Sequence, residues 1–407
     1  MHESEKTMAQ YTFKKALNFL KPKDIWNVAA CAIVFPFAMI AKIFIHNFWL
    51  ICEEENEARD NGYWFFRWIR ENHPEQKVAY AINKKSPDYR KVCDLGRVIS
   101  YGTLEHWFWY LVADKNISAH KGGKPNAAVC YFFEVVLKLR KNNRVFLQHG
   151  IIVNMLEWIF YQNTNMRLLV TGAKPEYDFI SAKFGYPEGY VRLLGLPRFD
   201  NLLNSTVEED LILVMPSWRE WIGRPSHDNR DLVFTQTEYF RAWNGLLNSR
   251  ELADLLEKYQ KRLIFFPHHN MQKYLSSFSV ENDRIKLAGW KEYDVQDLLK
   301  RASFLITDYS SVFFDFSYMG KPVLFYQFDE AEFREKQYQE GYFNYHDNPL
   351  GKWADTQQKV VWLLEDMLKN NYRPTPEQIE QYFPVRDTNN SKRCYDAITD
   401  IQKSKRR

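Results

Sequence analysis

The chain has 407 residues, of which 45% are hydrophobic and 26% charged, a composition typical of a folded globular protein and unlike that of a disordered chain or a polytopic membrane protein. The 55 Lys and Arg residues against 51 Asp and Glu residues give a net charge of only +4, which argues against nucleic-acid binding. Because the 5 cysteines are widely spaced, we expect neither a disulfide framework nor a zinc cluster, and a reducing compartment fits best.

The first apolar stretch in chain order covers residues 28–41, contains Pro36 and carries no charge. Its 14 residues are fewer than the roughly 20 that a spanning helix needs. No cleavable secretory signal is evident around it. Lysines precede the stretch and suit anionic lipid head groups, so we expect residues 11–42 to form one or two helices that lie in a membrane interface. An ordinary buried helix is the alternative interpretation.

From Phe48 onward, short β-rich runs alternate with helical periods, which is the pattern of βαβ units. In the first half we expect strands at 48–52, 78–82, 98–101, 117–120, 145–148, 168–171 and 191–194, and helices at 63–71, 103–112, 127–139 and 174–184. In the second half we expect strands at 211–215, 263–266, 304–307 and 323–326, and helices at 238–247, 251–260, 295–300 and 312–318.

This pattern predicts an α/β fold with two Rossmann-like, doubly wound domains. We expect a membrane-associating helical segment at 1–46, a first domain at 47–205, a second domain at 206–370 and a helical tail at 371–407. Ligands of doubly wound sheets bind beyond the carboxyl ends of the strands, so the cleft between the two domains is the expected site.

Several common catalytic fingerprints are missing from the sequence. No G-x-G-x-x-G follows an expected strand, and the P-loop, H-E-x-x-H and G-x-S-x-G motifs are absent. Dinucleotide-dependent, P-loop, zinc-protease and serine-hydrolase chemistry therefore lack support.

Polar side chains do follow the expected strands. His149 comes directly after one of them and precedes Gly150, which places an imidazole that titrates near neutrality at a strand end, as a general base requires. Arg219 follows another strand and carries the fork of donors that suits phosphate. The adjacent His268 and His269 follow a third. Taken singly, each could be a satisfied structural residue.

The strongest local pattern spans residues 307–316, where a strand ends at Thr307 and a helix begins near Ser311. Hydroxyl groups and free backbone N–H groups then gather at one place, which favours an anion. Ser310 or Ser311 could instead only cap the helix. Asp315, one turn later, could bind ligand hydroxyls or only complement the helix dipole.

At these residues the chain resembles the CDP-glycerol glycerophosphotransferase family, the teichoic-acid and capsule polymer synthases. The matching segments are QHG at 148–150, PSWR at 216–219, PHH at 267–269, TDYSSVFFDF at 307–316, NEARDNG at 56–62 and GLPRFD at 195–200. Their order and spacing are specific, and the resemblance covers about residues 49–345.

The resemblance implies a glycosyltransferase-B-type fold and peripheral attachment to the cytoplasmic face of the bacterial plasma membrane. It implies that His149 deprotonates an acceptor hydroxyl, which attacks the β-phosphorus of a CDP-alditol and expels CMP. The groups implied to hold the pyrophosphate are Arg219, His268, Thr307, Ser310 and Ser311.

Further roles follow from the same resemblance. Asp315 would contact the alditol, and the loop that contains Arg59, Asp60 and Asn61 would face the acceptor. No metal and no cofactor are expected. The implied partners are CDP-glycerol, a lipid-linked or polymeric glycan acceptor and the membrane surface, and a homo-oligomer is possible. The alternatives are a CDP-ribitol ribitolphosphotransferase, a nucleotide-sugar glycosyltransferase of the same fold and a non-enzymatic membrane-bound scaffold.

Overall fold

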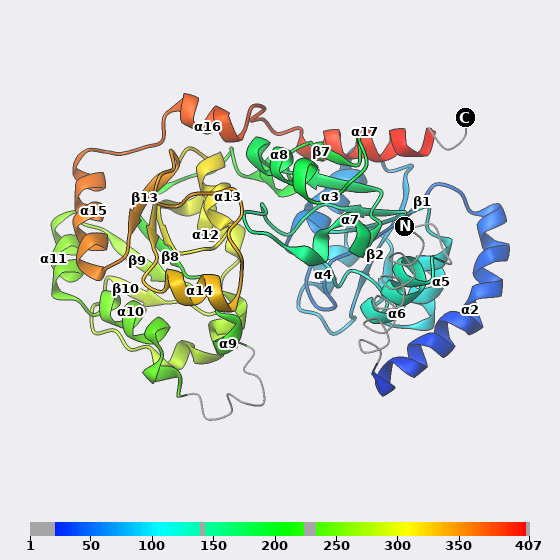
Figure 1. Cartoon of the computed structure of the whole chain (residues 1–407), viewed down its shortest axis with the longest axis horizontal. Helices are drawn as coiled ribbons and strands as arrows, with labels where there is room; N and C mark the ends of the chain where they lie inside the picture. The colour runs from blue at the N-terminus through cyan, green and yellow to red at the C-terminus, as the bar shows by residue number, and fades with distance from the viewer. Residues whose placement is uncertain (1–20, 139–142, 224–232, 404–407) are drawn as a thin grey trace, which may run out of the picture. The chain divides into compact units, whose positions relative to one another are not determined.

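Figure 1 shows a computed structural model of the chain, which describes residues 21–138, 143–223 and 233–403. The chain forms two compact units, and each is described by itself. Unit 1 is made of the described residues within 1–149, 157–200 and 388–407, and unit 2 of those within 150–156 and 201–387. Both units are doubly wound α/β folds, so the predicted fold class is confirmed. The domain boundaries and the interdomain cleft drawn from the sequence stay predictions.

The sheet of unit 1 has seven parallel strands. They are β1 (Phe48–Cys52), β2 (Lys77–Ile82), β3 (Val98–Ser100), β4 (Lys115–Ser118), β5 (Arg144–Phe146), β6 (Leu168–Thr171) and β7 (Val191–Leu193). All seven were predicted to within two residues at each end. Their order in the sheet is β3-β2-β1-β4-β5-β6-β7, so the chain reverses its direction of winding between β1 and β4. A crevice that binds ligands is expected at such a switch point.

The helical segments of unit 1 pack on this sheet. They are η1 (Pro22–Asp24), α2 (Ile25–Phe44), α3 (Asn61–Asn72), α4 (Tyr89–Cys93), α5 (Leu104–Val112), α6 (Ala127–Tyr131), η2 (Phe132–Val136), η3 (Glu157–Ile159), α7 (Tyr161–Thr164), α8 (Lys174–Lys183), η4 (Pro197–Asn201) and α17 (Asn390–Lys403). Several of these segments begin at a side-chain cap. Thr103, for example, caps α5 by accepting a hydrogen bond from the backbone N–H of His106. The helix predicted at 127–139 is α6 followed by the π-helical turn η2, and its last residue lies outside the described part.

Helix α2 differs from the helices expected at the N-terminus. It is a single 20-residue helix with Pro36 inside it and a mean hydropathy of 1.9, long and apolar enough by these measures to cross a membrane. The uncharged run of 14 residues is shorter than α2, because the helix also includes residues 25–27 before the run and residues 42–44, with the charged Lys42, after it. Only 22% of the helix is buried. The part predicted at residues 11–20 lies outside the described residues.

One stripe of α2 packs against α5, beside which it lies in Figure 1. The buried residues of this stripe are Ala30, Cys31, Val34 and Ala38, which recur at helical spacing. They belong to the same apolar cluster as Trp107 of α5. The rest of the helix exposes large apolar side chains, namely Ile25, Trp26, Val28, Ile33, Phe35, Phe37, Ile40, Ile43 and Phe44.

The sheet of unit 2 has six parallel strands. They are β8 (Glu208–Met215), β9 (Arg262–Phe265), β10 (Ile285–Leu287), β11 (Ala302–Thr307), β12 (Val323–Tyr326) and β13 (Gly351–Ala354). Their order is β10-β9-β8-β11-β12-β13, so the switch point lies between β8 and β11. The edge strands β10 and β13 were not predicted. Both are short and carry a lysine, and β13 begins at Gly351, where a Cβ atom would meet the carbonyl oxygen of Val323 at 2.7 Å.

The helical segments of unit 2 are α9 (Glu220–Gly223), η6 (Phe234–Gln236), α10 (Glu238–Leu247), α11 (Arg250–Lys258), η7 (His269–Ser277), α12 (Val295–Arg301), α13 (Val312–Tyr318), α14 (Glu330–Lys336), α15 (Gln357–Lys369) and α16 (Pro376–Tyr382). Helices α10 and α13 match the predicted ranges, whereas α14 and α15 were missed. The helical tail predicted after Asn371 is present as α16 and α17.

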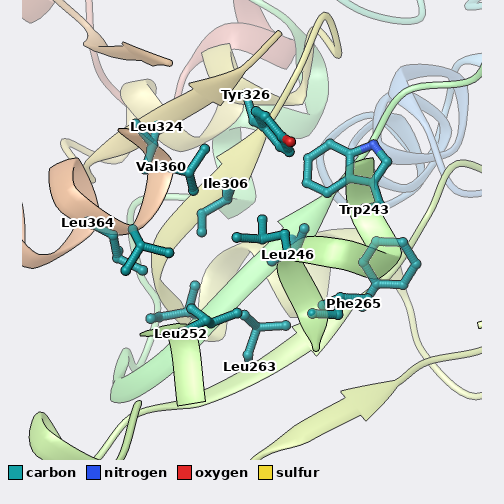
Figure 2. Close-up of a cluster of buried hydrophobic side chains, with 14 of the residues drawn as sticks. Trp243, Leu246, Leu252, Leu263, Phe265, Ile306, Leu324, Tyr326, Val360 and Leu364 are labelled. Carbon is teal, nitrogen blue, oxygen red and sulfur yellow. The ribbon is translucent and has the colours of Figure 1, made fainter. Parts of the chain in front are cut away.

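Figure 2 shows the core between the sheet of unit 2 and its helices. Trp243 and Leu246 of α10, Leu252 of α11 and Leu364 of α15 point toward apolar side chains of the central strands. Strand β11 is buried along its whole length, as expected for a central parallel strand covered on both faces. This packing fixes the carboxyl ends of β8, β9 and β11, where the predicted site residues of unit 2 follow.

Candidate active site

The switch point of unit 1 brings three titratable side chains together. Asp60 follows β1 through a short loop and caps α3, His120 follows β4, and His149 follows β5. His149 Nδ1 lies 2.5 Å from Asp60 Oδ2, and His120 Nε2 lies 3.7 Å from the same oxygen. The two imidazole ring centres are 4.4 Å apart. We call these three residues the His-Asp cluster.

The side chain of His149 is 64% exposed, whereas that of Asp60 is 11% exposed. An exposed imidazole whose Nδ1 is held by a buried carboxylate keeps Nε2 available to accept a proton. Asp60 was predicted to face an acceptor, and its carboxylate is instead engaged with His149 and with Arg198, whose Nη1 lies 2.7 Å from Asp60 Oδ1. The geometry makes Asp60 the group that orients the imidazole.

Backbone contacts fix the position of His149. The preceding residue, Gln148, has a φ of 66°, a left-handed conformation that costs energy for a residue other than glycine. Asn61 Nδ2 donates to the carbonyl oxygen of Gln148 at 2.7 Å, and Asn61 Oδ1 accepts from the backbone N–H of Arg198 at 3.0 Å. Arg198 also donates to the carbonyl oxygen of His149. Asn61 is fully buried and holds this turn, and its contact with an acceptor stays a prediction.

A second buried carboxylate, Glu53, holds the loop that carries Asp60. Its oxygens accept hydrogen bonds from the backbone N–H groups of Arg59, Asp60 and Tyr63 at 3.1, 3.4 and 2.9 Å. Burial, together with the charge of Asp60, raises the pKa of Glu53 to about 7. The side chain of Arg59, which was predicted to face the acceptor, pairs with Asp88 at 2.8 Å and is 22% exposed.

The three residues of the His-Asp cluster shift the pKa values of one another. Burial opposes ionisation of Asp60, but Arg198 and His149 outweigh it, and the pKa of Asp60 lies below its ordinary value. Nearby protein atoms displace part of the solvent around the His149 ring, which disfavours its charged form, but the charge and hydrogen bond of Asp60 prevail and raise the pKa of His149 above the ordinary value. Burial and the charge of His149 lower the pKa of His120 to about 4, so His120 is neutral at pH 7.

Arg219, in unit 2, is enclosed instead of lining a phosphate site. Its side chain is fully buried, with Nη1 2.9 Å from Asp308 Oδ2 and Nε 2.7 Å from Asp329 Oδ2. Nη1 also donates to Ser217 Oγ at 3.0 Å. The guanidinium is satisfied by protein groups and shielded from solvent, and its contact with phosphate stays a prediction. Arg219 instead ties the loop after β8 to the loops after β11 and β12.

The residues around the end of β11 fall into two groups. Ser310 and Ser311 are half-buried and sit where β11 passes into α13, and Ser311 is the N-cap residue without a side-chain cap hydrogen bond. Thr307 and Asp315 are buried. Thr307 Oγ1 donates to the carbonyl oxygen of Met215 at 2.6 Å, which links β11 to β8, and its contact with the CDP-alditol stays a prediction. Asp315 faces the interior, which speaks against a direct contact with an alditol.

The two histidines after β9 are in different surroundings. His268 is half-buried, its Nδ1 accepts from the backbone N–H of Asn270 at 3.2 Å, and its ring stacks on Trp218 with centroids 6.0 Å apart. His269 is exposed and stacks on Trp290 with centroids 4.8 Å apart. The accessible predicted residues of this edge are therefore His268, Ser310 and Ser311.

Sequence reasoning missed several residues that build the two sites. His120 was taken as the last residue of a strand, although the signal that identified His149, an imidazole directly after an apolar strand, applies to it as well. Arg198 and Asp308 stood inside recognised motifs but received no role. Glu53 and Asp329 gave no local signal, because their partners are distant in sequence.

Comparisons with known proteins place this geometry in context. A family model described as CDP-Glycerol:Poly(glycerophosphate) glycerophosphotransferase matches residues 33–400. The minor teichoic acid biosynthesis protein GgaB of Bacillus subtilis (strain 168) is 30% identical over 389 residues, which cover 90% of this chain and 42% of that protein. The teichoic acid poly(ribitol-phosphate) polymerase of Bacillus spizizenii is 30% identical over 106 residues, which cover 26% of this chain and 16% of that protein. The chain thus spans less than half the length of the curated relatives it matches.

Among solved structures, the wall teichoic acid polymerase TagF has a similar fold, with a TM-score of 0.63, 16% identity and coverage of 88% of this chain and 90% of that chain. A histidine-to-asparagine variant of TagF with CDPG has a TM-score of 0.62, 17% identity and coverage of 88% of this chain and 89% of that chain.

Proposed function

Because the chain belongs to the CDP-glycerol:poly(glycerophosphate) glycerophosphotransferase family, we propose that it transfers glycerol phosphate from CDP-glycerol to a hydroxyl group and releases CMP. The proposed acceptor is a lipid-linked or polymeric glycan in the synthesis of a teichoic-acid-like or capsular polymer. Support comes from the teichoic acid proteins among the relatives and from the variant of TagF with CDPG.

The observation that carries the proposal is the pair formed by His149 and Asp60. A general base must be accessible, correctly oriented and able to accept a proton near neutral pH. His149 is exposed, its Nδ1 is held at 2.5 Å by Asp60, and the turn on which it sits is fixed by Asn61 and Arg198. These contacts prepare Nε2 to take the proton of an acceptor hydroxyl.

The proposed reaction is a single displacement at phosphorus. As His149 Nε2 takes the proton, the acceptor oxygen forms a bond to the β-phosphorus of the donor, and the bond from that phosphorus to the oxygen that bridges it to the α-phosphorus breaks. CMP leaves with the electron pair, and the charge of the imidazolium is stabilised by Asp60. Transition states of phosphoryl transfer spread charge over the phosphate oxygens, so positioning and electrostatic stabilisation are the main tasks of the protein.

We assign donor binding to unit 2. His268, Ser310 and Ser311 are accessible at the carboxyl ends of β9 and β11, and they offer an imidazole and two hydroxyls to the pyrophosphate. Arg219 supports them indirectly, since it fixes the loops after β8 and β11 through Ser217 and Asp308.

The test is a donor panel of CDP-glycerol, CDP-ribitol and nucleotide sugars, scored by the nucleotide released. CMP from CDP-glycerol supports the proposal. CMP from CDP-ribitol alone would make the chain a ribitolphosphotransferase, an alternative kept open by the poly(ribitol-phosphate) polymerase among the relatives. Release of UDP from a nucleotide sugar would instead indicate a glycosyltransferase.

The same panel tests the base. His149→Gln should lower CMP release by about 10²-fold or more, the usual contribution of a general base, with little change in donor affinity. His346→Gln is the matched control, because His346 also pairs with a carboxylate, Glu330 at 2.7 Å, but lies in unit 2 after α14. Equal activity of wild type and His149→Gln would remove His149 from the mechanism.

We also propose that the exposed face of α2 rests on the cytoplasmic surface of the plasma membrane. A helix that packs along α5 through Ala30, Val34 and Ala38 is tied to the folded unit, which favours lying in the interface over crossing the bilayer. The exposed Trp26, Phe37 and Phe44 suit that interface. Such a surface is where a lipid-linked acceptor would be met.

A further inference from the structure

The His-Asp cluster offers more than a proton acceptor. Asp60 Oδ2, one ring nitrogen of His120 and one of His149 all lie within 4.8 Å of one another. We propose that this cluster binds a divalent transition-metal ion, with Zn²⁺ preferred, and that the bound ion switches off the base. The inhibitory consequence rests on the proposed function, whereas the binding itself does not.

The distances come close to those of a zinc site. Ligands about 2.0–2.2 Å from a tetrahedral ion are roughly 3.3–3.6 Å from one another. His120 Nε2 is already 3.7 Å from Asp60 Oδ2. His149 Nδ1 lies at 2.5 Å from that oxygen, so it must withdraw by about 1 Å to admit the ion. An imidazole that is 64% exposed has room for this rotation.

The metal-ligating atoms of the cluster determine which kind of ion fits. Two imidazoles and one carboxylate suit Zn²⁺ and its neighbours, whereas Mg²⁺ prefers oxygen ligands and octahedral geometry. Because His149 is exposed, the fourth position of a tetrahedral ion would be taken by water. The cluster thus has the three protein ligands and one open position that many exchangeable zinc sites have.

Surrounding contacts prepare the carboxylate for this role. Arg198 Nη1 holds Asp60 Oδ1 at 2.7 Å, so that Oδ2 is the oxygen turned toward both histidines. Glu53 fixes the backbone of Asp60 through the bond to its N–H. Such outer contacts usually strengthen a metal site. The positive charge of Arg198 opposes a second cation, and we therefore expect binding that chelators reverse.

Occupation of the cluster would stop the proposed reaction. Once the ion holds His149 Nδ1, the hydrogen bond to Asp60 is broken and the ring is rotated away from its position as a base. The ion would act as a reversible inhibitor, and the chain would respond to the supply of free Zn²⁺.

The test measures Co²⁺ binding to the full chain in the absence of any donor, because the visible spectrum of Co²⁺ distinguishes tetrahedral from octahedral coordination. We expect one ion per chain with a tetrahedral spectrum and displacement by Zn²⁺. His120→Gln and Asp60→Asn should each weaken Co²⁺ binding by about tenfold or more. Loss of an outer-shell partner already costs about that much, and these two residues are proposed as direct ligands. Thermal unfolding of both variants checks that they fold.

His346→Gln is again the matched control, since it removes a histidine that pairs with a carboxylate but has no second histidine in the pair. Binding that survives in His120→Gln and Asp60→Asn, or a Co²⁺ spectrum that is octahedral, would overturn the proposal. In a second arm, Zn²⁺ should inhibit CMP release by the wild type, and EDTA should restore it. Metal binding without any CMP release would contradict the proposed function alone, and CMP release without metal binding would contradict this inference alone.

Discussion

The residue that most shapes the proposed chemistry is Asp60. Its carboxylate stabilises the protonated form of His149, and this raises the pKa of His149 above the ordinary value. A general base must be neutral, so the rate of the wild type should rise with pH through a pKa above about 6.5. The residue that orients the proposed base would therefore also set the pH range in which the proposed reaction proceeds.

The Asp60→Asn variant separates these two effects. Loss of the carboxylate removes the stabilisation of the imidazolium, so the pKa of His149 falls and the acid limb of the pH–rate profile moves to lower pH. The rate on the plateau should fall by about 10²-fold or more, because an amide can hold the ring in the wrong tautomer. Asp88→Asn is the control, since Asp88 pairs with Arg59 of the same loop and should leave the acid limb in place. An unshifted limb in Asp60→Asn would show that Asp60 does not act on the base.

Arg219 makes the second prediction at this scale. Its guanidinium neutralises Asp308 and Asp329, all three being almost fully buried, so Arg219→Ala leaves two buried carboxylates without a cation. We expect a loss of about 3–5 kcal/mol in the free energy of unfolding, measured by denaturant titration. Arg250→Ala should change stability little, because the side chain of Arg250 is 91% exposed in its pair with Asp254. If Arg219→Ala keeps wild-type stability but binds the donor poorly, the original expectation of a phosphate contact is restored.

Among the elements, helix α2 has one buried face and one face of large apolar side chains that are exposed. Phe37 is 64% exposed, whereas the neighbouring Ala38 is fully buried against the rest of unit 1. Phe37→Glu should weaken binding to vesicles of anionic phospholipid by about tenfold or more, since exposing rather than burying a Phe side chain costs about 1.5–3 kcal/mol. The melting temperature should not change.

Ala38→Glu is the matched variant on the buried face. It places a carboxylate among apolar side chains and should lower the melting temperature. If Phe37→Glu binds vesicles as well as the wild type in a sedimentation assay, then the exposed face of α2 does not meet the membrane.

At the scale of the whole molecule, the chain returns to unit 1 in its last helix, α17, which contacts residues 195–200. Asp200 accepts hydrogen bonds from the backbone N–H groups of Asn390 and Ser391 at 2.7 and 2.9 Å. Gly195 lies so close that a Cβ atom would come within 1.7 Å of Asn390 Oδ1, and its φ of 79° also favours glycine. A short set of contacts thus fastens α17 to the segment that follows β7, nearly 200 residues earlier.

Asp200→Ala should loosen this attachment. Loss of a charged acceptor from two helix N–H groups costs about 1–2 kcal/mol, so amide exchange within α17 should accelerate while α10, in unit 2, keeps its exchange rates. Asp396→Ala provides the control, because Asp396 is an exposed residue of α17 that only pairs with Lys392. Unchanged exchange in Asp200→Ala would mean that apolar packing alone, such as that of Tyr395 on Trp49, holds the helix.

The sequence was sufficient for the architecture because the signals of βαβ units are local. Runs such as 48–52 and 323–326 are apolar and rich in β-formers, and both were predicted with the bounds that the structure shows. Strands β10 and β13 were not predicted, because each has only three or four residues, one of them a lysine, and so lacks a clear apolar run. The uncharged run at 28–41 is shorter than α2 because Asn27 before it is polar and Lys42 after it is charged, although both lie within the helix.

For the site, the sequence by itself determined which polar residues follow strands, and hence that His149, His268 and the paired serines lie at carboxyl ends, whereas His120 was missed. Only the tertiary structure decided how they pair. Asp60 reaches His149 across 89 positions and Arg219 reaches Asp329 across 110 positions, because the order of the strands, not the distance along the chain, makes them neighbours. Burial follows from the same packing, and it encloses Arg219, Thr307 and Asn61 within the protein. The sequence determines which side chains follow each strand, whereas the packing of helices on the sheets determines which of them are exposed and which pair with one another.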